Sequence, residues 1–196
     1  MVGSKLYNYS KIRVIAGKWR GRKIVFPNVE QSLRPTPDRV KETLFNWLQH
    51  DVMNATCLDL CAGSGSLGIE ALSRGAKSVH FIEKNHLLCE QIQNNINIFN
   101  ANSTTSNAKI HNDSAVNVVK YVAKNSINIV FLDPPYSSNL LENLATKLAT
   151  AELLAPQALI YCEQQKKTLF EPPAEWVLLK QKHFSKVEAL LFQNGE

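Results

Sequence analysis

From Thr56 onward, short apolar runs alternate with longer segments whose apolar residues recur at helical spacing. The runs that suit buried strands occupy residues 56–60, 78–83, 127–133 and 158–163. The segments that suit helices occupy residues 66–74, 86–99 and 140–149. Because strand and helix alternate, the chain is predicted to form a doubly wound, mostly parallel α/β sheet. Two extended runs at residues 176–184 and 186–192 predict an antiparallel hairpin at one edge of that sheet.

The N-terminal quarter of the chain carries most of its positive charge. Residues 1–50 hold ten Lys or Arg and three Asp or Glu, a net charge of +7, whereas the remainder has a net charge of −2. Two β-branched runs within residues 11–26 flank a loop between Gly17 and Gly21, which predicts a β-hairpin. Clustered cations favour a polyanionic partner, because each one placed on a phosphate releases counterions. We predict an RNA-binding hairpin extension at residues 1–35 and a main domain at residues 36–196; the alternative for the charge is a solvated face.

The hairpin loop combines cations with one aromatic ring, that of Trp19. This ring either stacks on a base or packs on the main domain. The residues expected to contact RNA are Lys18, Trp19, Arg20, Arg22, Lys23, Arg34 and Arg39. Further along, Thr36 is predicted to cap a helix that begins at Pro37, with Asp38 favoured in its first turn.

Residues 57–70 follow an apolar run, open a helical pattern and contain Gly63, Gly65 and Gly68 at the spacing G-x-G-x-x-G. This spacing is typical of nucleotide-binding turns, in which the missing Cβ lets a ligand approach the backbone. Asp59 disfavours a nicotinamide or flavin dinucleotide, because its carboxylate would repel the pyrophosphate. It suits the aminium group of S-adenosylmethionine, and its structural alternative is a cap on the following turn.

Two further carboxylates are candidates for the same cofactor site. Glu83 ends the second apolar run, where a carboxylate can accept hydrogen bonds from both hydroxyls of a ribose. Asp113 follows a short third strand and either receives the adenine amine or caps a helix that starts at Ser114. The expected cofactor residues are Asp59, Gly63, Gly65, Glu83 and Asp113. No metal is expected, because the cysteines lie in apolar segments without histidine partners.

An apolar strand at residues 128–132 runs into the motif Asp133-Pro134-Pro135-Tyr136. An exocyclic purine amine is a poor nucleophile, because its lone pair is delocalised into the ring. The Asp133 carboxylate and the Pro134 carbonyl can bind its two N–H groups and so turn the lone pair toward a sulfonium methyl group. The consecutive prolines stiffen the segment, and Tyr136 offers a ring on which an extruded base can stack. The alternative is a proline-rich turn after a buried strand.

The chain resembles the bacterial small-subunit 16S ribosomal RNA guanine-N2 methyltransferases. The matching segments are residues 13–17, 21–22, 33–48, 59–74 and 133–136. The resemblance implies a seven-stranded, Rossmann-like methyltransferase fold preceded by a small RNA-binding hairpin. It also implies methyl transfer from S-adenosylmethionine to the N2 amine of a guanine in 16S ribosomal RNA, within the assembling small ribosomal subunit.

Other functions stay open at this point. An adenine-N6 methyltransferase acting on DNA or RNA could use the same acid and prolines, although the chain lacks a long insertion for target recognition. Glutamine methylation on a protein and a non-catalytic RNA-binding assembly protein are further alternatives.

No run of about 18 apolar residues and no signal peptide is evident. We therefore expect a cytoplasmic protein that binds no membrane. We also expect a monomer, and the resemblance implies 16S ribosomal RNA as its partner.

Overall fold

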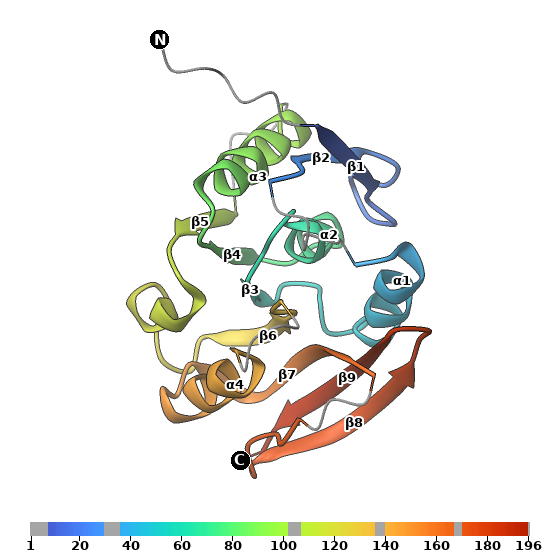
Figure 1. The fold of residues 1–196 in the computed structure, drawn as a ribbon. Coiled ribbons are helices and arrows are strands. Elements are labelled where there is room, and N and C mark those ends of the chain that lie inside the picture. The colour runs from blue at the N-terminus through green and yellow to red at the C-terminus, as the bar shows by residue number, and fades with distance from the viewer. Residues whose placement is uncertain (1–7, 30–35, 102–106, 136–139, 167–169, 196) are drawn as a thin grey trace.

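One mixed sheet organises the part of the chain that the structure describes. The computed structural model describes residues 8–29, 36–101, 107–135, 140–166 and 170–195. The parallel strands are β3 (Thr56–Leu60), β4 (Ser78–Glu83), β5 (Ala108–Asn112), β6 (Ile127–Leu132) and β7 (Leu154–Gln165). The antiparallel strands are β8 (Trp176–His183) and β9 (Val187–Asn194). Their order across the sheet is β5-β4-β3-β6-β7-β9-β8, which confirms the predicted doubly wound sheet and its edge hairpin (Figure 1).

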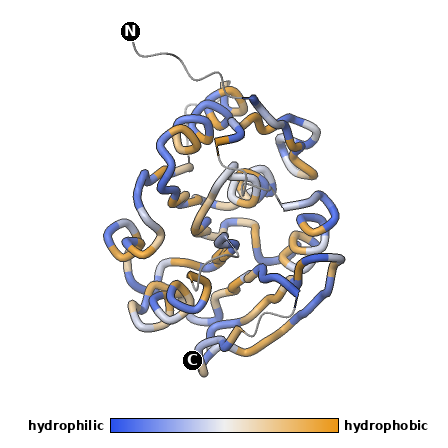
Figure 2. The backbone as a smooth tube through the Cα atoms, in the orientation of Figure 1, coloured by the Kyte–Doolittle hydropathy of each residue, from blue (hydrophilic) through white to orange (hydrophobic). Residues whose placement is uncertain are grey.

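Helices cover both faces of this sheet. They are α1 (Asp38–Trp47), α2 (Ser66–Ser73), α3 (His86–Phe99), α4 (Leu140–Thr150) and the 3-10 helix η1 (Ala115–Lys120). Successive side chains of a strand point to opposite faces, so Cys57 of β3 packs with α1, α2 and α3, whereas Leu58 and Leu60 pack with η1 and α4. Figure 2 shows hydrophobic residues along the central strands and alternating colours along the helices. The sheet is therefore buried on both faces, as a parallel sheet requires.

A separate antiparallel hairpin precedes the main domain. Its strands are β1 (Tyr9–Arg13) and β2 (Lys23–Pro27), which confirms the hairpin predicted at residues 11–26. Figure 1 shows the hairpin beside α3, and the amide of Asn95 on α3 binds both backbone groups of Val25. Hydrogen bonds to the backbone therefore fix β2 on the main domain.

A fully buried carboxylate on α2 also attaches the hairpin to the main domain. Glu70 accepts hydrogen bonds from the backbone N–H groups of Ile15 at 2.7 Å and Ala16 at 2.9 Å. The guanidinium of Arg74 completes its coordination at 2.8 Å. The loop after β1 is thus held by a charged group, which makes stronger hydrogen bonds than a neutral one.

Trp19 packs on the main domain and does not present its ring to solvent. It is 4% exposed, and its ring centroid lies 5.4 Å from that of Phe99. Its backbone N–H donates to the hydroxyl of Ser73 on α2. Of the two interpretations of Trp19, the packing alternative is the one observed, and the ring is not available for stacking on a base.

The start of α1 differs from the sequence prediction. The helix begins at Asp38, Pro37 occupies the N-cap position, and no side chain caps the helix. The hydroxyl of Thr36 instead donates to the carboxylate of Asp133, at 3.4 Å. The backbone carbonyl of Pro37 accepts hydrogen bonds from the N–H groups of Val40 at 2.9 Å and Lys41 at 3.0 Å, and these bonds form the first turn of the helix.

Gly68 brings α2 close to the sheet. A Cβ at this position would lie 2.3 Å from Cε1 of Phe81 on β4, far inside van der Waals contact. The third glycine of the turn is therefore required for packing between helix and strand. Among the described residues, no helix is both long enough and apolar enough to cross a membrane.

Glu70→Ala is expected to lower the free energy of unfolding by about 3 kcal/mol, because it leaves two N–H groups of the hairpin and the charge of Arg74 without their acceptor. Denaturant titration measures this change. The matched control is Glu90→Ala on α3, whose exposed carboxylate pairs with His86 and should matter by less than about 0.5 kcal/mol. Losses of equal size in the two variants would contradict the role of Glu70.

Candidate active site

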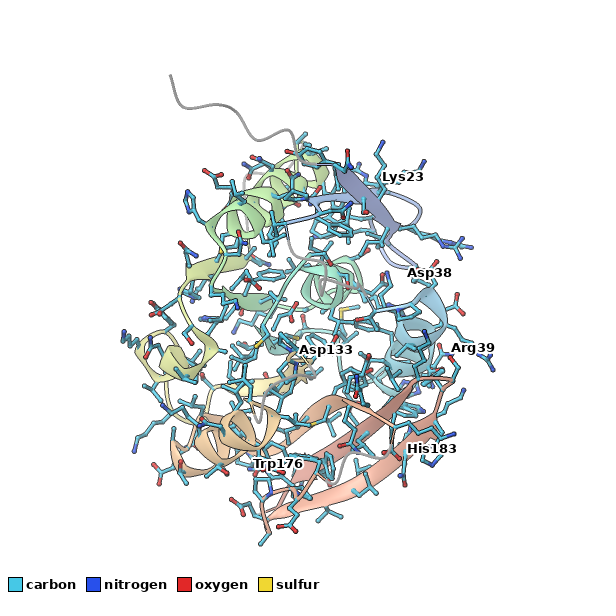
Figure 3. All side chains as sticks on the ribbon, in the orientation of Figure 1. Lys23, Asp38, Arg39, Asp133, Trp176 and His183 are labelled. Carbon is cyan, nitrogen blue, oxygen red and sulfur yellow. The ribbon has the colours of Figure 1, made fainter. Side chains whose placement is uncertain are left out.

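A cavity of about 880 Å³ opens at the carboxyl ends of the parallel strands β3, β4, β6 and β7. Its walls come from the start of α1, the turn between β3 and α2, the start of η1, and the turn between β8 and β9. Figure 3 labels Asp133 near the middle of the molecule, at the end of β6. Open parallel sheets bind ligands at this edge, so the cavity is the candidate site.

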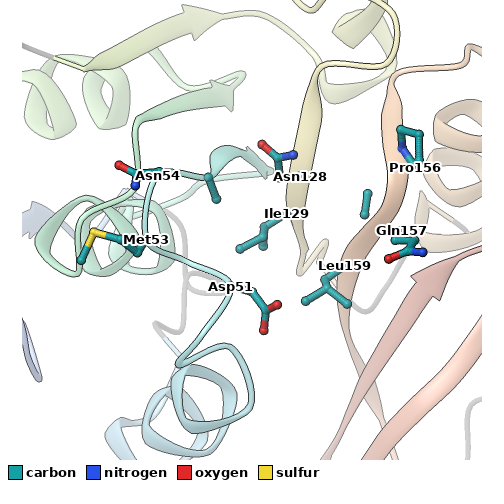
Figure 4. Close-up of a pocket in the computed structure, with 10 residues that line it drawn as sticks. Asp51, Met53, Asn54, Asn128, Ile129, Pro156, Gln157 and Leu159 are labelled. Carbon is teal, nitrogen blue, oxygen red and sulfur yellow. The ribbon is translucent and has the colours of Figure 1, made fainter.

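A second, smaller hollow of about 340 Å³ lies at the opposite ends of the parallel strands, where β3, β6 and β7 begin (Figure 4). It is lined by the segment before β3 and by the starts of β6 and β7, including Asp51, Asn128 and Gln157. None of the predicted catalytic or cofactor residues lines it. It therefore has no part in the chemistry that the sequence predicts.

Four acidic side chains from neighbouring strands line the larger cavity. They are Asp59 of β3, Glu83 of β4, Asp133 after β6 and Glu163 of β7. Asp59, Glu83 and Glu163 are each less than a tenth exposed, at 3%, 7% and 4%. The floor of the cavity is consequently lined by buried carboxyl groups.

Burial perturbs two of these carboxyl groups strongly. The pKa of Asp59 is raised to about 8, first by burial and then by the charge of Glu83, while the hydrogen bond from the Gly68 N–H lowers it. The pKa of Asp133 lies well above its usual range, because of burial first and then the charges of Glu163 and Asp59. Shifts of this kind, in a cavity, are typical of functional sites.

The glycine turn holds the first two carboxylates in place. The Gly63 N–H donates to Glu83 at 2.8 Å, and the Gly68 N–H donates to Asp59 at 2.9 Å. Glu83 also accepts from the backbone N–H of Asn85, at 2.8 Å. The hydrogen bond to Gly68 is the capping role that was the alternative for Asp59, and the same side chain also lines the cavity.

The predicted glycines have different positions. Gly63 lines the cavity, whereas Gly65 does not. Gly65 has a φ of +73°, and a Cβ there would lie 2.9 Å from Cγ1 of Ile92. It serves the tight turn that begins α2, so of the two predicted cofactor glycines only Gly63 reaches the cavity.

Asp113 is occupied by local hydrogen bonds. Its carboxylate accepts from the Ser114 N–H, the Asn117 amide and the Tyr121 hydroxyl, each at 2.7 Å. The hydrogen bonds from Asn117, Tyr121 and Ser114 hold the pKa of Asp113 well below its usual range. Ser114 and Ala115 line the cavity, but Asp113 does not. The 3-10 helix begins at Ala115 with Ser114 at its N-cap position, so Asp113 is not the N-cap of a helix that starts at Ser114. Its carboxylate is instead bound by donors of the same local turn.

The Asp-Pro-Pro motif lies at the opposite side of the cavity floor from Glu83. Asp133, Pro134 and Pro135 all line the cavity, and Pro134 is buried. Thr36, which the sequence analysis treated as a cap, hydrogen bonds to Asp133 and helps to orient it. Tyr136, the predicted stacking residue, lies outside the described residues.

Glu163 was missed by the sequence analysis. The sequence does contain a sign of its role. The apolar run at residues 158–163 ends in a carboxylate, just as the run at residues 127–133 ends in Asp133. Neighbouring parallel strands place such ends side by side, but strand order is needed to know which runs are neighbours. The β6 to β7 pairing supplies that order.

The predicted RNA-contacting residues separate into exposed and occupied groups. Lys18, Arg20 and Lys23 are exposed on the hairpin. Arg22 donates to the carbonyl of Phe99 at 2.8 Å, so part of its guanidinium holds the hairpin in place. Arg34 lies outside the described residues, and Arg39 lines the larger cavity. Other exposed cations at this rim are Lys84 and Lys186.

Comparisons with known proteins agree with this arrangement. The family model described as Conserved hypothetical protein 95 matches residues 12–193. The Haemophilus influenzae protein named ribosomal RNA small subunit methyltransferase D is 44% identical over 185 residues, which is 94% of each chain. The Escherichia coli K12 protein of the same name is 41% identical and aligns over 93% of this chain and 90% of its own. A solved structure of a putative Escherichia coli methyltransferase matches at 40% identity, with a TM-score of 0.80 over 95% of this chain and 99% of that one.

Asp59→Asn is expected to stabilise the fold at pH 8 by about 1 kcal/mol or more, since each pKa unit corresponds to about 1.4 kcal/mol. An unfolded Asp titrates near pH ~3.9, whereas Asp59 in the folded protein titrates at about 8. Ionising this group therefore removes stability as the pH rises from about 4 to about 8. The asparagine keeps an acceptor for the Gly68 N–H, and unfolding measured across this pH range should show the gain shrinking toward pH ~4.

Asp113→Asn provides a control of opposite sign. The pKa of Asp113 is lowered by its hydrogen bonds, so its ionised form stabilises the fold above the pKa of an unfolded Asp. This variant should be less stable than the wild type at pH 8, and the difference should vanish in acid. If both variants shifted stability in the same direction, the assigned carboxylate environments would be wrong.

Proposed function

This chain belongs to the family described as Conserved hypothetical protein 95. We propose that it transfers a methyl group from S-adenosylmethionine to the N2 amine of a guanine in 16S ribosomal RNA. One observation carries the proposal. A rigid Asp133-Pro134 acceptor pair and a buried acidic floor line the same cavity. The names of the relatives support ribosomal RNA of the small subunit as the substrate.

The donor set of the cavity fits a cationic cofactor. When bound, S-adenosylmethionine would supply a methyl group made electrophilic by a sulfonium centre and would leave as the thioether S-adenosylhomocysteine. It also carries an aminium group. Asp59 would hold the aminium, and Glu83 would accept hydrogen bonds from the ribose hydroxyls. Gly63 lets the ligand approach the backbone of the turn, and Ser114 and Ala115 line the wall beyond. A dinucleotide fits poorly, because its pyrophosphate would face these buried carboxylates.

Asp133 and Pro134 would act on the amine of the target base. The Asp133 carboxylate accepts one N–H and the Pro134 carbonyl accepts the other, which turns the nitrogen lone pair toward the methyl group. As the nitrogen gains the methyl group it becomes positive, and Asp133 stabilises that charge and accepts the departing proton. Burial raises the pKa of Asp133 and so favours its neutral form. A cation bound in the same cavity would keep Asp133 ionised until then.

The exposed cations would bind the RNA backbone. Lys18, Arg20 and Lys23 lie on the hairpin, and Arg39 lies at the rim of the cavity, so phosphate contacts at these positions would orient the substrate. We assign residues 1–35 to RNA binding on this ground. We further propose that the protein acts as a monomer in the cytoplasm, on the assembling small ribosomal subunit.

Nucleoside analysis by mass spectrometry tests the proposal as a whole. Ribosomal RNA from cells that lack this protein should lose one N2-methylguanosine, and the purified protein with S-adenosylmethionine should restore it. Restoration of an N6-methyladenosine would instead establish the adenine alternative. If neither nucleoside changed, a non-catalytic assembly protein would be the better account.

Asp133→Asn should lower the rate of methyl transfer by about a hundredfold to a thousandfold, because an amide keeps an acceptor oxygen but cannot stabilise the positive nitrogen. Single-turnover kinetics with saturating cofactor and RNA measures this rate, and calorimetry should show that cofactor affinity is retained. The matched control is Asp51→Asn in the smaller hollow, which should leave the rate unchanged. A near-normal rate for Asp133→Asn would contradict the catalytic role of Asp133 and would favour the alternative that the motif is a structural turn.

Replacing Lys18, Arg20 and Lys23 by Ala should weaken RNA binding and reduce the slope of log K against log salt by about 2, since each phosphate contact contributes about 0.7 to 0.9. The replacement leaves Arg22 in place, because Arg22 holds the hairpin to Phe99. A variant with the same loss of charge elsewhere replaces Lys77, Lys109 and Lys124, which are exposed and lie outside the hairpin. Equal salt slopes for the two triple variants would show that the hairpin cations are only a solvated face.

A further inference from the structure

Glu163 is a buried carboxylate in the cavity for which the proposed reaction gives no role. It lies near the end of β7, is 4% exposed and lines the cavity together with Asp133. Leu132 and Cys162 are paired in the parallel register of β6 and β7, so Asp133 and Glu163 are the next residues on adjacent strands. Adjacent strands lie about 4.8 Å apart. Glu163 is therefore the nearest strand-end carboxylate to Asp133 on the side of β7.

The order of the strands separates Glu163 from the cofactor residues. Across the sheet the order is β4, β3, β6 and β7, which places Glu83 and Asp59 on one side of Asp133 and Glu163 on the other. If the cofactor lies over Asp59 and Glu83, and the amine of the base lies at Asp133, the body of the base extends toward β7. Glu163 is then in position to contact the base and not the cofactor.

Glu163 is also held in place from below. Its Oε2 atom accepts a hydrogen bond from the hydroxyl of Tyr161, at 3.0 Å, and Tyr161 is fully buried. These residues are two apart on one strand, so their side chains share a face of the sheet. The contact with Tyr161 therefore helps to orient Glu163 in the wall of the cavity.

The atom next to the reacting amine distinguishes the two purines. In guanine, the carbon that bears the N2 amine is flanked by N1, which carries a hydrogen and donates. In adenine, the carbon that bears the N6 amine is flanked by N1, which carries a lone pair and accepts. A buried carboxylate beside the amine stabilises a donor at N1 and repels a lone pair there.

Resting on the proposed methyl transfer to guanine, we propose that Glu163 accepts the N1–H of the target base and sets the preference for guanine. Asp133 then binds the amine, and Glu163 binds the adjacent ring nitrogen. Reading a base along its Watson–Crick edge in this way requires that the base leave its stack, as enzymes acting on bases require. Glu163 is a positioning and specificity residue in this scheme, and Asp133 carries the chemistry.

A substrate with 2-aminopurine at the target position tests this proposal. That base keeps the N2 amine but has a lone pair at N1 in place of the hydrogen. Ribosomal RNA ligated from transcribed and synthetic pieces would carry guanine or 2-aminopurine at the nucleotide that the wild-type enzyme methylates, both as free RNA and in reconstituted subunits. The measured quantity is the ratio of kcat/KM for guanine to kcat/KM for 2-aminopurine.

The wild type should prefer guanine by about a hundredfold or more, because a buried group left against the wrong partner discriminates strongly. Glu163→Gln should reduce the ratio at least about tenfold, since an amide can donate to the lone pair of 2-aminopurine as well as accept from guanine. A merely structural role for Glu163 would lower both rates equally and leave the ratio unchanged, which would overturn the proposal.

The matched control is Glu188→Gln on β9. Glu188 is also buried, accepts a hydrogen bond from Gln164 at 2.8 Å and does not line the cavity. This variant should keep the wild-type ratio, and a fall in its ratio equal to that of Glu163→Gln would contradict a specific role for Glu163. The outcomes also separate the two proposals. Absence of methyl transfer from the wild type to guanine would reject the proposed function, whereas efficient transfer with no preference over 2-aminopurine would reject only the role of Glu163.

Discussion

The larger cavity depends on four carboxyl groups at or near the carboxyl ends of four neighbouring parallel strands, those of Asp59, Glu83, Asp133 and Glu163. Burying ionised carboxylates together is costly unless hydrogen bonds or opposite charges offset the lost solvation. The glycine turn offsets part of that cost, because its N–H groups bind Asp59 and Glu83. The raised pKa values of Asp59 and Asp133 indicate that part of the desolvation cost is not offset. A cationic ligand would stabilise the ionised forms of these carboxyl groups, which is the physical reason that the cavity suits such a ligand.

Sequence patterns were sufficient for the sheet, because strand and helix periodicities are local. They also placed Asp59, Glu83 and Asp133 correctly at strand ends. They could not give the partner of Thr36, the burial of Trp19 or the proximity of Glu163 to Asp133. Each of these depends on which distant segments become neighbours, and the bond from Thr36 to Asp133 joins residues 97 positions apart.

Asp113 illustrates a different limit of sequence analysis. A carboxylate after a strand suits either a ligand or a local turn, and both interpretations fit the same residue types. The choice is made by Tyr121 and Asn117, whose donors converge on Asp113 only because the 3-10 helix folds back over it. Because donors of the same turn already bind the carboxylate of Asp113, a ligand would gain little by binding that side chain.

The attachment of the hairpin through Glu70 has a consequence for the order in which the chain assembles. The contacts of Glu70 with Ile15 and Ala16 span 55 and 54 residues. During synthesis from the N-terminus, β1 and β2 are complete long before α2 exists to receive them. The most basic segment of the nascent chain must therefore wait undocked until the glycine turn and its helix have been made. The eight-residue helix α2 follows the glycine turn and also carries Glu70, which binds the hairpin. The hairpin can therefore dock through Glu70 only after the turn and α2 have formed.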